Sequence, residues 1–142
     1  MTERVLVRAP NWVGDTVLSL PALRDVRRNF PGARLEVLAR PAVADLYRAL
    51  SEVDAVRESL LFGQDVAALR GAFDLGVLFP NSYASSLLLY RAGIKERFGY
   101  ATDGLSLLLT RRAPVPPEIR GESEVYYYRA MLAGVGLTVT AA

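Results

Sequence analysis

The chain has 142 residues, of which 51% are hydrophobic and 23% are charged, and its formal net charge is +2. These values are typical of one folded domain that is large enough to bury a core. Because the chain has no Cys and no His, disulfides, thiolate catalysis, imidazole acid–base chemistry and nearly all zinc sites are excluded. Any proton transfer would therefore use Asp, Glu, Tyr or Lys. The small net charge gives no indication of nucleic-acid binding.

The first residues run directly into an apolar strand pattern, without the apolar core and cleavage site of a signal peptide. No run of 18 or more apolar residues could span a membrane, and the longest uncharged run, residues 75–90, is interrupted by Pro80 and polar residues. We therefore expect a soluble cytoplasmic domain, which could still touch a membrane surface as a peripheral protein.

The chain opens with an apolar strand at residues 4–8, followed by a turn and then a helix. Gly14 in this turn permits a tight bend and the close approach of a ligand to the backbone. Asp15 stands where the helix is expected to begin, which is the carboxyl end of the first strand, where open α/β sheets bind ligands. This segment is the first candidate site.

Strand patterns and helix patterns then alternate along the chain. The expected strands are residues 4–8, 34–39, 53–56, 73–79 and 94–100, and the expected helices are residues 15–30, 41–50, 65–70, 82–92 and 122–133. Residues 105–110 fit a helix or a strand, residues 113–117 read as an extended connector, and no strand pattern follows the last helix, as in a fragment. The alternation predicts βαβ units and a Rossmann-like, mostly parallel sheet between helices.

Pro21 complicates the first helix, because proline inside a helix removes one hydrogen bond and clashes with the preceding turn. Either the helix is kinked and begins at Asp15, or a short turn precedes a main helix that Ser19 caps, with Pro21 in its first turn.

The first loop contains neither Gly-x-Gly-x-x-Gly nor a P-loop sequence. On physical grounds alone, Asp15 is most simply a carboxylate that caps the helix or interacts with its dipole. Trp12, the only tryptophan, either folds back onto the core or forms a platform for a sugar or another acceptor.

Two further segments are expected at the same edge. Asn81 and Ser82 follow the fourth strand, which would neighbour the first strand in a doubly wound sheet, so their polar groups would face Asp15. Plain helix capping explains the same two residues. Residues 95–100 carry Lys95 and Arg97, which would lie near this edge unless the segment is simply a solvated edge strand.

The motifs together resemble a known family. The run Pro-Asn-Trp-Val-Gly-Asp-Thr-Val-Leu-Ser-Leu-Pro-Ala-Leu, from Pro10, is similar to the start of the bacterial lipopolysaccharide heptosyltransferases, and the heptosyltransferase II branch of glycosyltransferase family nine is most similar. Residues 30–33 (Phe-Pro-Gly-Ala), 78–82 (Leu-Phe-Pro-Asn-Ser) and 92–100 agree in order, so the resemblance covers most of residues 4–136.

The resemblance implies the N-terminal half of a two-domain GT-B glycosyltransferase, with residues 1–142 forming the acceptor-binding Rossmann-like domain and the donor-binding domain absent. It implies inverting transfer of heptose from ADP-heptose to the lipopolysaccharide inner core at the inner membrane, with no metal or cofactor and no nucleic acid. It matches Asp15 to the catalytic base. The acceptor-binding positions that we expect from the resemblance and the loops are Asn11, Trp12, Gly14, Thr16, Asn81, Ser82, Arg97 and Tyr100.

Three alternatives remain open at this stage. The chain could be a family member that uses another sugar or acceptor, a binding module without catalysis, or a nucleotide-binding domain. The lack of a phosphate-binding loop argues against the third. On the half-enzyme interpretation, this chain alone folds but does not catalyse.

Overall fold

The computed structural model describes residues 2–80, 82–101, 106–115 and 124–139. The strands are β1 (Arg4–Arg8), β2 (Arg34–Ala39), β3 (Ala55–Glu58), β4 (Leu75–Leu78), β5 (Glu96–Ala101) and β6 (Arg111–Pro114). The helices are α1 (Val13–Asn29), α2 (Pro41–Arg48), α3 (Phe62–Leu69), α4 (Tyr83–Arg91) and α5 (Glu124–Gly134), with a short 3₁₀ helix, η1 (Ser106–Leu108).

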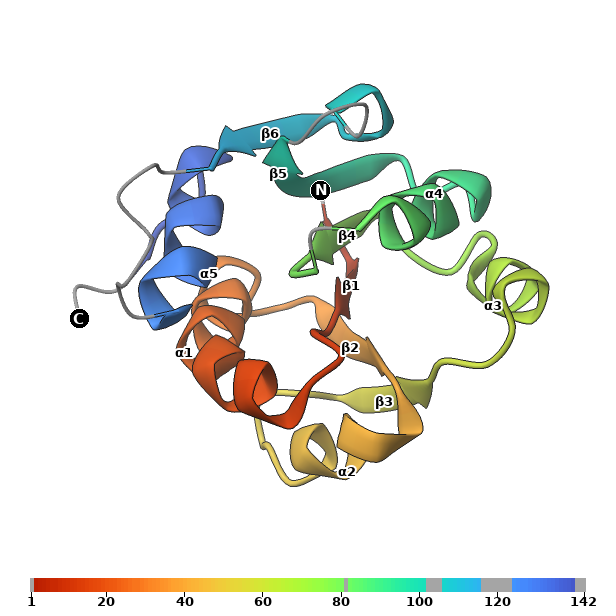
Figure 1. The fold of residues 1–142 in the computed structure, drawn as a ribbon, viewed down its shortest axis with the longest axis horizontal. Coiled ribbons are helices and arrows are strands. Elements are labelled where there is room, and N and C mark those ends of the chain that lie inside the picture. Colours follow the sequence, from red (N-terminus) through yellow and green to blue (C-terminus); the bar gives the residue numbers. More distant parts are fainter. Residues whose placement is uncertain (1, 81, 102–105, 116–123, 140–142) are drawn as a thin grey trace.

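The six strands form one parallel sheet in the order β3-β2-β1-β4-β5-β6 (Figure 1). Strand β1 lies in the middle, where Val7 pairs with Val37 of β2 and with Val77 of β4. The order reverses between β1 and β4, which confirms the expected α/β fold and the expected adjacency of the first and fourth strands. In such sheets this reversal creates a crevice beyond the carboxyl ends of the strands.

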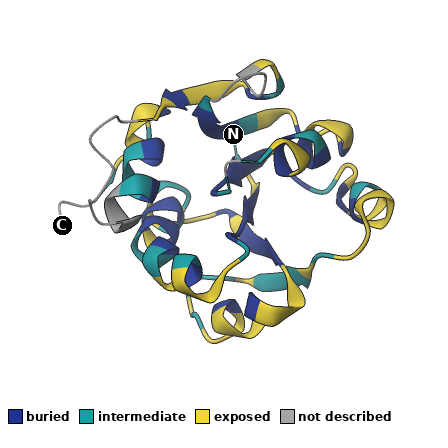
Figure 2. Ribbon diagram, in the orientation of Figure 1, coloured by how far each residue is buried: buried dark blue, intermediate teal, exposed yellow. Residues whose placement is uncertain are grey.

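Helices cover both faces of the sheet: α1, α2 and α5 lie on one side, and α3 and α4 on the other (Figure 1). Side chains alternate between the faces along each strand. Val5 and Val7 of β1 therefore join the core beneath α1, α2 and α5, whereas Leu6 joins the core beneath α3 and α4. Figure 2 shows the buried central strands between helices whose outer surfaces are exposed.

Helix α1 is continuous from Val13 to Asn29 with Pro21 inside it. This agrees with the first expected form, apart from a start two residues earlier, and rules out the second. Ser19 does not cap a second helix, since its buried hydroxyl donates to the Thr16 carbonyl at 2.8 Å. Pro21 has no N–H to donate, but the buried side chains of Ala22 and Leu23 directly after it hold the helix on the sheet. Tertiary packing thus outweighs the local cost of the proline.

The expectation of an extended connector at residues 113–117 is wrong for its first residues. Residues 113 and 114 belong to strand β6, which pairs with β5. Arginines at 111 and 112 and a terminal Pro114 hide the strand pattern, and both residue types are typical of sheet edges. Helix α5 packs closely on β6, since a Cβ on Gly134 would lie 2.5 Å from the Ala113 Cβ.

Most other element boundaries moved by one to three residues, and two of them illustrate this. Strand β3 ends at Glu58 rather than at 56, and helix α3 begins at Phe62 rather than at 65. Among the described residues, no helix is both long enough and apolar enough to cross a membrane.

Candidate active site at the carboxyl edge of the sheet

The candidate site lies where β1 and β4 end side by side. The two strands are parallel neighbours, with Arg8 opposite Leu78, so the loops that follow them leave from the same edge of the sheet. The first loop leads into α1 on one face and the second leads into α4 on the other face (Figure 1). The structure therefore brings the two candidate segments to one edge, as the sequence predicts.

Asp15 occupies the first turn of α1 and its side chain is half-buried. Within the described residues, its carboxylate has no hydrogen-bond or ion-pair partner. The helix does not use it as a cap, because the N-cap position is Trp12. The open N–H groups of the first turn stabilise a negative charge there, while both carboxylate oxygens stay available to accept a proton from a ligand.

The residues around Asp15 leave space beside it. A Cβ on Gly14 would meet nothing within 4 Å, and Gly14 lies in the helix with an ordinary φ rather than in a tight bend. The expectation of a glycine turn is thus wrong, but the backbone is open to a ligand at this point. Trp12 is 70% exposed, so it does not fold back onto the core.

Thr16 has a structural role in this structure. Its side chain is fully buried and its hydroxyl donates to the Trp12 carbonyl at 2.9 Å, the same carbonyl that accepts from the Thr16 N–H. Thr16 therefore holds the turn that carries Trp12, rather than presenting its hydroxyl to a ligand.

Sequence reasoning missed Arg8, the last residue of β1. It points to the α3–α4 side of the sheet between Leu38 and Leu78 and is only 6% exposed. Its guanidinium donates to the Leu38 carbonyl at 3.1 Å and to the Asn11 side chain at 3.4 Å. Burial, followed by the charge of Arg40, lowers the pKa of Arg8 from its ordinary value. The sequence did hold an indication of this role, because Arg8 is a charged residue at an inward-facing position at the end of a buried strand.

The second loop is described only in part, because Asn81 lies outside the described residues. Ser82 is the N-cap of α4, and its hydroxyl accepts from the Ser85 N–H at 3.2 Å. The capping interpretation is therefore confirmed for Ser82. The helix ends before Gly93, whose φ of 75° suits glycine.

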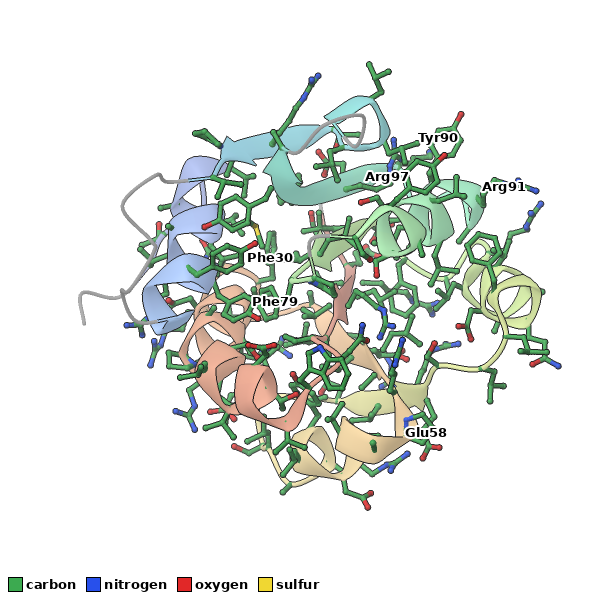
Figure 3. The ribbon with its side chains drawn as sticks, in the orientation of Figure 1. Phe30, Glu58, Phe79, Tyr90, Arg91 and Arg97 are labelled. Carbon is green, nitrogen blue, oxygen red and sulfur yellow. The ribbon has the colours of Figure 1, made fainter. Side chains whose placement is uncertain are left out.

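Arg97 does not lie at the candidate site, which corrects the expectation. It is the second residue of β5 and lies towards the amino end of the sheet, beside Tyr90 near the end of α4 (Figure 3). Its guanidinium donates to the Leu108 and Ile94 carbonyls, both at 2.6 Å, and stacks 5.2 Å from the Tyr90 ring centre. These contacts hold η1 and β5 together, so Arg97 is not free to meet a ligand.

Tyr100 also turns away from the open edge. It is buried, and its hydroxyl donates to the Tyr127 carbonyl of α5. The two tyrosine rings pack with centroids 4.6 Å apart. Tyr100 therefore joins α5 to the sheet, which is a packing role.

The chemistry that this edge offers is that of a proton acceptor and several hydrogen-bond donors. Within the described ranges, no three His, Cys, Asp or Glu side chains gather into a set that could hold a metal ion. Asp15 supplies the acceptor, Arg8 and Asn11 supply donors, and Trp12 supplies an exposed aromatic face.

Comparisons with known proteins agree with this arrangement, although no family model matches the chain. The chain is 27% identical over 115 residues to lipooligosaccharide heptosyltransferase 2 of Haemophilus ducreyi, an alignment that covers 75% of this chain. It is 28% identical over 109 residues to lipopolysaccharide heptosyltransferase 2 of Escherichia coli, an alignment that covers 68% of this chain. The solved structure of E. coli ADP-heptose lps heptosyltransferase II matches 94% of the chain with a TM-score of 0.78 and 26% identity.

The chain is a distant homologue of the lipopolysaccharide heptosyltransferases. The match lies in their N-terminal part. It covers 33% and 31% of the two relatives and 41% of the solved chain. The chain thus spans about a third of the length of the curated relatives it matches. Its six-stranded parallel sheet corresponds to the N-terminal half of the GT-B heptosyltransferase fold.

Proposed function

We propose that this chain is the acceptor-binding half of a heptosyltransferase, which transfers heptose from ADP-heptose to the inner core of lipopolysaccharide at the membrane surface. The observation that carries the proposal is the half-buried carboxylate of Asp15, which has no partner among the described residues. It stands at the carboxyl edge of the sheet beside the open space over Gly14. The homology to heptosyltransferases supports the choice of reaction.

Asp15 acts as the general base of this reaction. Its carboxylate accepts the proton of the acceptor hydroxyl as the hydroxyl oxygen bonds to the anomeric carbon of heptose. The bond between that carbon and the ADP oxygen breaks, and ADP leaves from the opposite side, so the anomeric configuration inverts. The donor and the charge of its diphosphate are held by a second domain, as in the two-domain architecture that the homology implies.

The remaining residues of the edge position the acceptor. Trp12 offers its exposed ring to the face of a sugar, and Asn11 donates or accepts hydrogen bonds next to it. Thr16 acts indirectly, by holding the Trp12 turn. Asn81 stays a predicted acceptor contact from the second loop, next to the capping residue Ser82.

The test is a transfer assay on Asp15→Asn in the full-length, two-domain protein that the proposal requires. We expect a loss of at least about 100-fold in kcat, because general-base catalysis contributes about 10²–10⁴, with an unchanged acceptor KM. Asp45→Asn is the matched control, since the Asp45 side chain is 90% exposed on α2. Turnover of Asp15→Asn within threefold of the control would overturn the assignment.

The 142-residue chain alone supplies a second test. We expect it to show no transfer and no micromolar binding of ADP by calorimetry, because the proposed donor contacts belong to the other domain. Positioning two substrates together can lower the activation barrier by about 7–11 kcal/mol at the extreme. The chain loses that contribution when the second domain is missing. Micromolar ADP binding would instead support a nucleotide-binding domain.

A further inference from the structure

A second polar feature lies at the same edge, on the face opposite α1. It is a cavity of about 140 Å³ between the end of β1, the loop after β3, and the first turns of α3 and α4. Its lining includes Arg8, Ser59, Leu60, Asp65, Ala84 and Ser85. One water occupies roughly 30 Å³ in the liquid, so the cavity has room for a larger polar group.

Arg8 forms the floor of this cavity and has unused hydrogen-bonding capacity. A guanidinium has five N–H donors, and the bonds to Leu38 and Asn11 use two of them. Its Nε is buried and meets no acceptor within the described part of the chain. An unpaired buried donor costs about 1–3 kcal/mol and more when it is charged, so the Arg8 guanidinium gains from an acceptor that pairs with its remaining N–H groups.

The other walls are fixed and add donors rather than acceptors. Both carboxylate oxygens of Asp65 are already engaged, since they accept from the Ser59 hydroxyl at 2.8 Å and the Leu60 N–H at 3.0 Å. The Ser85 hydroxyl oxygen accepts from Ser82 at 2.8 Å, which leaves its own proton free to donate. The cavity therefore presents N–H and O–H groups in a preformed arrangement.

The local charge also favours a negative ligand. Arg8 and Arg40 carry positive charges close enough to influence each other, and Asp65 offsets only one of them. Arg8 is almost fully buried between two leucines, where its charge is poorly solvated. A planar fork of donors in such a place matches the geometry of a carboxylate or phosphate.

We propose that the cavity over Arg8 is a binding subsite for one small anionic group, a phosphate or a carboxylate, held by the Arg8 guanidinium and the Ser85 hydroxyl. This subsite is separate from the proton acceptor Asp15, which belongs to the helix on the other face. Under the proposed function, the group is a substituent of the acceptor. Anion binding itself needs no glycosyl transfer, so it is tested independently of that function.

The experiment is an NMR titration of the ¹⁵N-labelled chain with inorganic phosphate and, separately, with acetate, at an ionic strength held constant with sodium chloride. We expect a saturable shift of the Arg8 Nε–H and Ser85 backbone N–H signals at millimolar concentrations. The two titrations distinguish a phosphate site from a carboxylate site. Shifts that do not saturate in either titration would overturn the proposal.

Ala84 provides a matched pair of variants, because it is exposed on the first turn of α4 and lines the cavity. Ala84→Glu places a negative charge at the entrance and is expected to weaken anion binding at least fivefold, whereas Ala84→Gln has the same size and stays within twofold of the parent chain. Equal affinities of the two variants would overturn the proposal. Arg97→Lys, far from the cavity, is expected to leave the titration unchanged.

Discussion

Helix α1 carries two aspartates, ten residues apart, whose surroundings differ sharply. Asp25, near the end of the helix, is 1% exposed and pairs with Arg28 and with Arg129 of α5, each at 3.1 Å. Asp15, in the first turn, is half-buried and has no partner in the described part of the chain. One carboxylate fixes helix to helix, while the other keeps its oxygens available.

The same contrast extends to the two edges of the sheet. At the amino edge, Asp74 accepts from the backbone N–H groups of Glu3 and Arg4, both at 2.9 Å, and Asp54 accepts from Leu35. At the carboxyl edge, Asp15 and Arg8 keep hydrogen-bonding capacity that no described residue uses. Asp74 and Asp54 thus stabilise the fold at the amino edge, whereas Asp15 and Arg8 keep hydrogen-bonding groups for a ligand at the carboxyl edge.

The strongest test of this contrast compares two substitutions on α1 in the 142-residue chain. Asp25→Asn removes the buried charge that Arg28 and the largely buried Arg129 each meet at 3.1 Å, so we expect a loss of about 2–3 kcal/mol in the free energy of unfolding. Asp15→Asn breaks no contact with a described side chain and removes only the interaction of the charge with the helix N-terminus, so the expected loss is smaller, within about 1 kcal/mol. Urea denaturation measures both.

Equal losses in these two variants would show that Asp15 is a stabilising residue of α1, and the contrast would fail. A loss confined to Asp15→Asn would show that its charge at the N-terminus of α1 serves stability rather than a ligand.

Substitution of Arg97 is expected to give the next largest loss of stability, because Arg97 makes structural contacts near the amino end of the sheet. Arg97→Ala removes the bonds to the Leu108 and Ile94 carbonyls and the stacking on Tyr90. We expect a loss of about 1–2 kcal/mol in unfolding free energy, and no change in acceptor KM in the two-domain protein. A several-fold rise in acceptor KM at unchanged stability would restore Arg97 to the site.

Most of the fold was predictable because its signals are local. The strand Arg4–Arg8 has three consecutive aliphatic residues between its arginines, and Arg34–Ala39 is apolar apart from Arg34 and Glu36. The structure gives both strands the predicted bounds. Strand β6 was missed because it lies at the sheet edge, where arginines replace the apolar pattern. The continuity of α1 through Pro21 depends on packing against the sheet, which no local propensity reports.

The candidate site was only partly predictable, for a related reason. Asp15 follows a strand end directly, so its edge could be inferred from chain order. Arg97 was misplaced because a strand has two ends, and the motif does not say which residue of β5 reaches the open one. Arg8 was missed because its position looks like the end of a hydrophobic strand, and only the folded structure shows a buried guanidinium with unused donors.

A smaller effect is expected at the amino edge of the sheet, where the contribution of Asp74 to the unfolding free energy depends on pH. Hydrogen bonds from the Glu3 and Arg4 backbone N–H groups lower the pKa of Asp74 below its ordinary value. Such a group stabilises the fold above its unfolded pKa of about 3.9, and the contribution is lost as the pH falls through the lower folded pKa. We expect Asp74→Asn to cost about 1 kcal/mol at pH 7 and much less at pH 2.5, by urea denaturation at both pH values. A cost independent of pH would contradict this.

Gly14→Ala gives the smallest effect on stability and the sharpest separation of stability from function. A Cβ at position 14 meets nothing within 4 Å, and Ala suits a helix better than Gly, so we expect a gain of about 0.5 kcal/mol in unfolding free energy. The same methyl group would occupy the space beside Asp15 that the proposed acceptor approaches. In the two-domain protein we therefore expect a rise of several-fold in acceptor KM. A variant that is more stable and transfers heptose with an unchanged KM would show that the acceptor does not approach the backbone at Gly14, and the proposed acceptor path would have to run over the α4 side of the edge instead.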